Sequence, residues 1–329
     1  LIIAVGMTLV IATRGIDLSV GAVVALSTII AARLLEADWN PVVVIVIILL
    51  TTSTLGLLVG LMIHIFKVQP FIATLAAMFL ARGLCYIIAK ESISIDHPFF
   101  VAMANLRIPL GFGLSMSPSV VVALLALAVG VWVLQYTRFG RTTYAIGGGE
   151  QSGMLMGLPT SRTKVLVYVV SGFCSGLAGV LYAFYTLSGY ALTAVGTELD
   201  AIAAVFIGGA AVTGGIGTVV GSMIGGLVMG VLNLGLANMS VDQNLIQVIK
   251  GLVLLGAVAF DVLSKMQGKP SIIGMIQRGM RRGDGNATVD QTPVRAELMR
   301  SSDEGVAEFL DLERVKPNTL GNTRMLALV

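Results

Sequence analysis

Long uninterrupted apolar runs dominate this 329-residue chain, and they limit what it can fold into. A helix that crosses a bilayer needs about 20 mainly apolar residues, because the hydrocarbon core is about 30 Å thick and each residue rises about 1.5 Å. The runs are long and continuous, whereas barrel strands are about 10 residues long and alternate in polarity. Spans are predicted over residues 1–12, 18–35, 42–66, 71–89, 118–136, 165–187, 196–212, 216–237 and 244–263.

The predicted fold class is therefore all-α, a polytopic transmembrane helical bundle with about nine spans in this sequence. The first run starts at Leu1 with no charged leader before it, so we expect the N-terminal helix or helices to be missing and the full chain to have about ten spans. A transmembrane domain is predicted over residues 1–264. Residues 265–329 hold 10 of the 21 Lys and Arg and 8 of the 18 Asp and Glu, which predicts a polar, disordered cytoplasmic tail.

A weak internal similarity recurs at an offset of 200 residues. Transporters are often built from repeats, and this pattern suggests a parallel one. Chance matching within glycine-rich apolar sequence is the alternative. The matching residues are Ala4, Val5, Thr13, Gly15, Ile16, Val20 and Gly21 with Ala204, Val205, Thr213, Gly215, Ile216, Val220 and Gly221.

Charged residues in the loops predict the orientation and the partners. Lys and Arg in short loops stay on the cytoplasmic side. If loop 137–164 is inside, six basic residues lie inside against three outside, which predicts that both chain ends are cytoplasmic. The lipid bilayer is an expected partner, and nucleic acid is not, because the net charge is only +3 and no basic stripe occurs. The inner set is Arg14, Lys67, Arg138, Arg141, Arg162 and Lys164, and the outer set is Arg33, Lys90 and Arg107.

The sequence contains no pattern typical of a catalytic or cofactor site. A Gly-x-x-x-x-Gly-Lys-Ser/Thr loop is absent, so we expect no ATP site in this chain. His64 and His97 stand apart from carboxylates and cysteines, which predicts no metal site and no enzyme activity. Cys85 and Cys174 lie in apolar runs and are interpreted as buried small hydrophobic residues.

Charged and glycine residues between predicted spans are candidates for a gate or helix turn. Arg14 and Asp17 flank Gly15 between the first two runs, and ionisable groups beside a bilayer are costly to bury. We interpret the segment as a broken-helix turn in which Asp17 caps the next helix. An ordinary structural cap with a salt link to Arg14 is the alternative. Gly214 and Gly215 precede another membrane helix and join the predicted gate, although close helix packing also explains such glycines.

The loop at residues 137–164 is long enough to hold structure. Its glycines at 147–149 predict a hinge, and a short helix is predicted over 150–157. A short helix in a loop buries little by itself, so we expect it to bind headgroups or another protein. The residues of this predicted coupling loop are Gly147, Gly148, Glu150, Leu155 and Gly157.

Polar side chains within the later spans are candidates for a solute path. Asn233, Gln247, Tyr182 and Tyr185 would suit an uncharged polyhydroxyl solute, while hydrogen bonds between helices explain them equally well. Lys250, about two turns into the last span, is expected to extend outward to the membrane surface.

Taken in order, several motifs resemble the permeases of ribose-type ABC sugar importers. They are GMTLVI at 6–11, GIDLSVG at 15–21, QPFIATL at 69–75, YAIGG at 144–148, ELDAIAAV at 198–205 and GGIGT at 214–218. Within that family, ARG at 81–83, ESISIDHP at 91–98 and SGYAL at 188–192 are most similar to galactofuranose permeases.

The resemblance implies partners for this chain. They are a second permease subunit, alike or unlike, two cytoplasmic ATPase subunits that hold ATP and Mg, and an extracytoplasmic sugar-binding protein. It also implies that the helix in the coupling loop docks into an ATPase groove of a bacterial inner-membrane importer.

Two residues depart from the family pattern. Arg14 stands where a glycine is usual, and Gly153 lies in the predicted loop helix, where glycine costs about 0.5–1 kcal/mol relative to alanine. The predicted function is monosaccharide import by alternating access, powered by separate ATPases. The alternatives are an ion-coupled secondary transporter, for which Asp17, Asp200 and Asp261 would be the relays, and a membrane enzyme acting on lipid.

Overall fold

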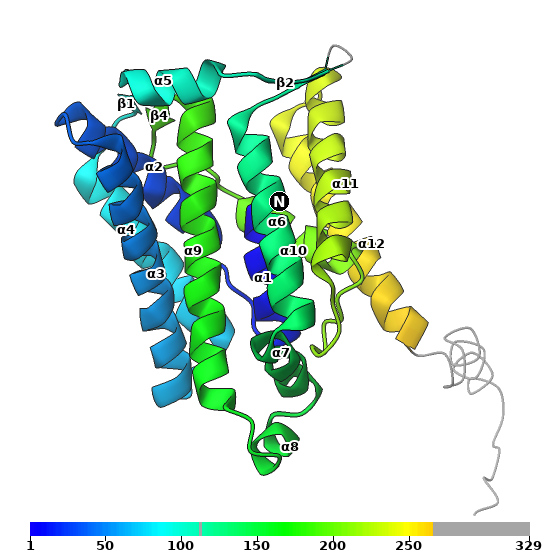
Figure 1. Ribbon diagram of the computed structural model, residues 1–329. Helices are drawn as coiled ribbons and strands as arrows, with labels where there is room; N and C mark the ends of the chain where they lie inside the picture. The colour runs from blue at the N-terminus through cyan, green and yellow to red at the C-terminus, as the bar shows by residue number, and fades with distance from the viewer. Residues whose placement is uncertain (112–113, 266–329) are drawn as a thin grey trace, which may run out of the picture. The chain divides into compact units, whose positions relative to one another are not determined.

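The computed structural model describes residues 1–111 and 114–265, and these form a bundle of long helices (Figure 1). The predicted tail lies outside the described residues except for Lys265, which ends the last helix. The elements are α1 (Ile2–Ala12), α2 (Val20–Glu36), α3 (Pro41–Ile65), α4 (Pro70–Ile88), β1 (Ile93–Ser94), α5 (Pro98–Asn105), β2 (Ile108–Gly111), β3 (Leu114–Met116), α6 (Pro118–Tyr136), α7 (Arg138–Gly148), α8 (Glu150–Leu155), α9 (Thr160–Thr186), β4 (Ser188–Gly189), α10 (Thr197–Ile207), α11 (Val219–Asn238) and α12 (Gln243–Lys265).

The described helices confirm an all-α polytopic membrane bundle. Five of them, α3, α4, α6, α9 and α11, are long and apolar enough to cross a bilayer. The structure differs from the expected set of spans at 196–212, where α10 has only 11 residues. At about 1.5 Å per residue α10 is about 16 Å long, roughly half the hydrocarbon thickness.

Proline starts several of these helices. It occupies the first helical position of α3, α4, α5 and α6. Proline suits this position because the first N–H groups of a helix have no intrahelical partner and its φ is already helical. At α3 the side chain of Asn40 also accepts a hydrogen bond from the Val42 N–H at 2.9 Å.

Helix α9 is the most buried of these five candidate spans and packs against α1, α2 and α3. Small residues allow this close packing. A Cβ added at Gly172 of α9 would lie 2.4 Å from the Thr52 carbonyl oxygen of α3, and one at Gly176 would lie 2.1 Å from the Thr52 hydroxyl. Membrane helices gain van der Waals contact by such close approach of their backbones.

The two ends of the bundle carry different structures (Figure 1). At one end, β1 pairs antiparallel with β4 and β2 pairs antiparallel with β3, beside α5. Phe99 and Phe100 of α5 pack edge-on against Phe184 near the end of α9. At the other end lie α7 and α8, which come from the predicted coupling loop.

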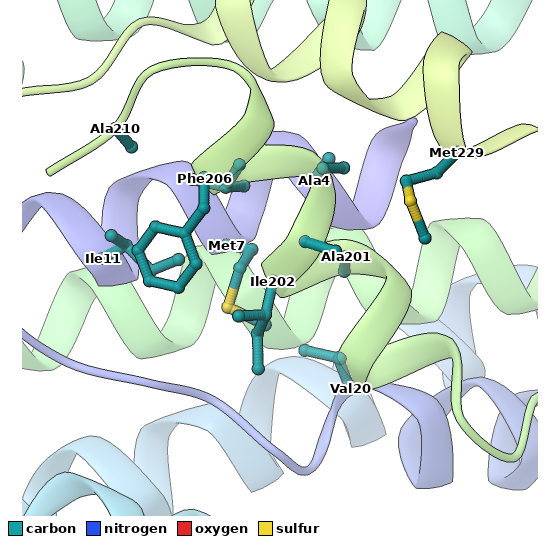
Figure 2. Packing of buried hydrophobic residues seen from close by; sticks show 12 residues of the cluster. Ala4, Met7, Ile11, Val20, Ala201, Ile202, Phe206, Ala210 and Met229 are labelled. Carbon is teal, nitrogen blue, oxygen red and sulfur yellow. The ribbon is translucent and has the colours of Figure 1, made fainter. Parts of the chain in front are cut away.

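The short helices α1 and α10 pack against each other in the interior. Met7 and Ile11 of α1 lie in one buried cluster with Ile202 and Phe206 of α10, as Figure 2 shows. Each helix is followed by a turn and then by a longer helix, and these longer helices, α2 and α11, begin at Val20 and at Val219. The repeat at an offset of 200 residues stays a prediction.

Candidate functional site

The turns that follow α1 and α10 meet the C-terminal end of α7, and we call this contact the turn junction. It comprises Ala12, Arg14, Gly147, Gly148, Gly214 and Gly215. The Gly215 N–H donates to the Ala12 carbonyl at 2.9 Å. The Arg14 guanidinium donates from Nε to the Gly147 carbonyl at 2.8 Å and from Nη2 to the Gly148 carbonyl at 3.1 Å. The structure thus joins residues that the sequence assigned separately to a gate and to a coupling loop.

The backbones at the turn junction approach so closely that side chains cannot fit between them. A Cβ added at Gly147 would lie 1.9 Å from the Ala12 carbonyl oxygen and 2.2 Å from the Gly215 nitrogen. Gly214 and Gly215 have φ of +75° and +76°, a left-handed conformation that glycine adopts without penalty. Gly147 lies inside α7, so the hinge expected at 147–149 is instead the end of a helix with Gly149 as its C-cap.

Arg14 holds this contact from an unusual backbone conformation. Its φ is +64°, which is uncommon for a residue with a side chain. In the family that the sequence motifs resemble, this position is usually glycine, which would adopt this φ freely. The guanidinium binds α7 carbonyls instead of forming the alternative salt link to Asp17, since among the described residues Arg14 has no ion pair. Carbonyl oxygens at a helix C-terminus attract a cation, because the helix dipole is negative there.

Asp17 is buried beneath the same turn and is fully hydrogen-bonded. Its Oδ1 accepts from the Ser19 N–H at 3.0 Å and from the Ser19 hydroxyl at 2.6 Å. Its Oδ2 accepts from the Ser171 hydroxyl of α9 at 2.7 Å. The N-cap residue of α2 is Ser19 and makes no capping bond with its side chain. The prediction that Asp17 caps α2 is therefore wrong: Asp17 lies two residues before the N-cap and ties the turn to α9.

Two tyrosines support the turns from neighbouring helices. The Tyr144 hydroxyl of α7 donates to the Gly217 carbonyl in the second turn. Burial raises the pKa of Tyr144, so its hydroxyl stays protonated and able to donate. The Tyr168 hydroxyl of α9 lies against Gly15, where an added Cβ would be only 2.3 Å away. A side chain at position 15 would therefore have to displace the Tyr168 hydroxyl.

Helix α8 and its C-cap residue Met156 present apolar side chains to the outside. The side chains of Met154, Leu155 and Met156 are 52%, 90% and 68% exposed, and we call them the α8 apolar patch. The helix predicted over 150–157 is confirmed, but it ends at Leu155. Gly157 then turns the chain with a φ of +74°. Glu150 faces back toward the bundle and pairs with Lys164 of α9 at 2.6 Å.

The residues predicted to line a solute path lie at two separate places in the structure. Tyr182 and Tyr185 line a cavity of about 530 Å³ near the start of α1. Gln247 lines another cavity, of about 380 Å³, together with Asp200 and Lys250. Asn233 donates to Asp200 at 3.4 Å, next to this second cavity.

The ion pair of Asp200 with Lys250 was not predicted. Lys250 Nζ lies 2.9 Å from Asp200 Oδ2, so the expectation that Lys250 extends outward to the membrane surface is wrong. The sequence did contain one indication of this ion pair. A lone lysine in an apolar run needs a polar or oppositely charged partner when its side chain faces protein. Its partner Asp200 lies 50 positions away in the sequence, and that spacing does not predict the contact.

These features define a polytopic membrane transport protein in which a helical loop is bound directly to two interior turns. Residues 1–258 match the family described as "Branched-chain amino acid transport system / permease component". The chain belongs to this family of transport permease components.

Curated relatives support the assignment. The inner membrane ABC transporter permease protein YjfF of Escherichia coli (strain K12) is 40% identical over 232 residues, covering 70% of each chain. The fructose import permease protein FruG of Bifidobacterium longum (strain NCC 2705) is 41% identical over 78% of this chain and 77% of that protein. The ribose import permease protein RbsC of Bacillus subtilis (strain 168) is 39% identical over 79% and 80%. No solved structure matches the chain. The chain is a multi-pass inner membrane protein.

Proposed function

We propose that this chain is the membrane-spanning permease subunit of an ABC importer that moves a monosaccharide into the cell. Its relatives are named as ribose, fructose and arabinose permeases, which supports a small sugar as the solute. Galactofuranose is the sugar that the resemblance of segments 91–98 and 188–192 suggests. The observation that carries the proposal is the turn junction, because it offers a direct mechanical connection from an exposed loop helix to the interior of the bundle.

The end of the bundle with α7 and α8 is proposed to face the cytoplasm. Arg14, Lys67 and Lys164 line one cavity of about 650 Å³ at this end, together with Glu150. Arg138 and Arg141 of α7 lie at the same end. An excess of Lys and Arg in short loops favours the cytoplasmic side.

The proposed mechanism is alternating access driven from α8. An ATPase subunit would bind the α8 apolar patch, and ATP with Mg would be held entirely on that partner. Movement of α8 displaces α7, and Gly147 and Gly148 pass the displacement to Arg14 and Gly215. Because these residues belong to the turns after α1 and α10, both short helices move with the loop. A second permease subunit and an extracytoplasmic binding protein complete the importer.

The substitution Leu155→Asp tests the docking step. Leu155 is 90% exposed, so an aspartate there leaves the bundle intact but places a charge in the proposed apolar contact. We expect Leu155→Asp to abolish co-purification with the ATPase and ATP-dependent sugar uptake, with unchanged thermal stability. Ser152→Asp is the matched control, because it adds the same charge to α8 and removes no apolar surface. Undiminished ATPase binding by Leu155→Asp would refute the docking site.

Uptake by the complete importer in proteoliposomes tests the function itself. Ribose, fructose, arabinose and galactose should be assayed with and without ATP in the vesicle compartment that holds the ATPases. ATP-dependent uptake of one or more sugars is expected. Uptake that needs no ATPase and collapses with an uncoupler would instead establish the ion-coupled alternative.

A further inference from the structure

Asp200, Lys250 and Asn233 form a polar cluster inside the helical bundle, contributed by α10, α12 and α11. Lys250 Nζ lies 2.9 Å and Asn233 Nδ2 3.4 Å from the same oxygen, Oδ2 of Asp200. The side chains of Asp200 and Lys250 are only 23% and 22% exposed. Moving two charges out of water is costly, and apolar side chains of similar volume would hold helices together as well or better. Helix packing alone therefore does not explain this pair.

A cavity of about 380 Å³ lies beside the cluster. Its volume falls within the range of about 300–1,000 Å³ that is typical of small-molecule sites. Its charged and amide groups come from Glu198, Asp200, Lys250 and Gln247, and Leu199 and Leu254 supply part of its apolar wall. A mainly apolar cavity with a few convergent polar groups is the usual form of a binding site for a small solute.

We propose that this cavity is a subsite for a neutral polyhydroxyl solute, a monosaccharide in transit through the bundle. The inference rests on the proposed function and adds the residues that would contact the sugar. A hydroxyl group both donates and accepts, while Lys250 only donates, Asp200 only accepts, and Gln247 does both. Because the Asp200–Lys250 pair has no net charge, a neutral solute can bind to it without leaving either of these two charges unpaired.

Glu198 also lines this cavity, but its carboxylate is held by the protein. Its Oε1 accepts from the Gly196 N–H at 3.2 Å. Its Oε2 is buried and has no hydrogen-bond partner among residues 1–111 and 114–265. That oxygen is packed against α2, where a Cβ added at Gly21 would lie 2.2 Å from it, so the subsite is argued from Asp200, Lys250 and Gln247.

Weak binding is expected at this subsite. The cavity is lined by aliphatic and polar residues, and none of its described lining residues is aromatic. A transport path needs binding that is favourable enough to admit the solute and weak enough to release it. The sugar should therefore protect a cysteine placed at the cavity from chemical labelling only at high sugar concentration.

Cysteine protection tests occupancy directly in the complete importer. Val195→Cys places a thiol at the cavity, where Val195 is 61% exposed, and Ile224→Cys places one on α11 at a residue that is 54% exposed and does not line it. Cys85 and Cys174 are buried, so the unsubstituted protein gives the background for maleimide labelling. The transported sugar, titrated to saturation, should slow labelling of the Val195→Cys protein by about half when the site is half occupied. It should leave Ile224→Cys unaffected. Equal rates with and without sugar at Val195→Cys would overturn the subsite.

Uptake by two further variants separates this inference from the proposed function. Gln247→Leu removes a side chain with no hydrogen bond to the described protein, so the variant should fold. The double variant Asp200→Asn with Lys250→Gln keeps the cluster neutral and of similar size. Each should lower sugar uptake at low sugar concentration about tenfold, while the ATPase stays bound, since a hydrogen bond to the sugar is lost. Wild-type uptake by both variants would overturn the subsite, whereas absence of ATP-dependent uptake in the unsubstituted importer would refute the proposed function.

Discussion

Replacing Gly147 by alanine is the sharpest test of the turn junction. Gly147 lies where α7 meets the backbones of both turns, and an added Cβ would be 1.9 Å from the Ala12 carbonyl oxygen. A carbon and a carbonyl oxygen normally stay about 3.3 Å apart or more. The backbones must therefore separate by roughly 1.4 Å to accept a single methyl group.

Such a separation would break the hydrogen bonds that form the junction. The bond from Arg14 Nε to the Gly147 carbonyl at 2.8 Å joins the first turn to α7, and the added Cβ would press against both atoms of the bond from the Gly215 N–H to the Ala12 carbonyl at 2.9 Å. Overpacking costs about 1–3 kcal/mol, and each lost hydrogen bond costs about 0.5–1.5 kcal/mol. We expect Gly147→Ala to lower the free energy of unfolding by about 1–5 kcal/mol, after about 1 kcal/mol for the intrinsic helix preference of alanine is subtracted.

Gly148→Ala provides the matched control one residue further along the same helix. A Cβ at Gly148 meets nothing within 4 Å, so only the helix preference of alanine remains. We expect this variant to be as stable as the wild type or more stable by about 0.5–1 kcal/mol. Both variants should be purified in the same detergent and unfolded by heat and by denaturant.

The functional assay is sugar uptake together with ATP hydrolysis by the assembled importer. If the turn junction transmits motion from α7 to the short helices, Gly147→Ala should reduce uptake more than ATP hydrolysis, while Gly148→Ala should leave both unchanged. Equal stability and equal uptake for the two variants would refute the reasoning, because the steric difference between Gly147 and Gly148 is its whole basis.

Two further substitutions test the support of the first turn. Ser171→Ala removes the donor to the buried Asp17 carboxylate and should lower the free energy of unfolding by about 1–3 kcal/mol, whereas Ser175→Ala removes only a bond to its own helix and should cost less than about 1 kcal/mol. Equal thermal midpoints for these two would contradict the role given to Ser171. Arg14→Gly should be about 1 kcal/mol more stable than Arg14→Ala in denaturant unfolding, because glycine adopts the φ of +64° without strain and both variants lose the same bonds. Arg14→Ala matching or exceeding Arg14→Gly would count against a strained backbone at this position.

Local features of the sequence were enough to predict the helical membrane bundle and most helix ends. Continuous apolar runs require helices in lipid, since every backbone polar group must be paired within the segment. The spans predicted at 42–66, 71–89 and 118–136 begin within one residue of the helix starts at Pro41, Pro70 and Pro118. The short helix predicted over 150–157 likewise begins at Glu150.

The length of α10 could not be predicted from its apolar content. Residues 196–212 are as apolar as a short span, but the helix stops at Ile207. Gly209, Gly214 and Gly215 then adopt positive φ, a conformation that glycine permits but does not require. Contact of this turn with Ala12 and with α7 decides that conformation, and those contacts lie far away in the sequence.

The sequence by itself determined the class of protein, because hydrophobicity, helix preference and charge act over a few residues at a time. Only the tertiary structure decided which distant groups meet. Arg14 binds carbonyls more than 130 residues away, and Lys250 pairs with Asp200 on another helix. Hydrogen bonds and ion pairs depend on distances of about 3 Å, which only the packed helices fix. The gate and coupling residues were recognisable one by one, but their union at the turn junction is a property of the fold.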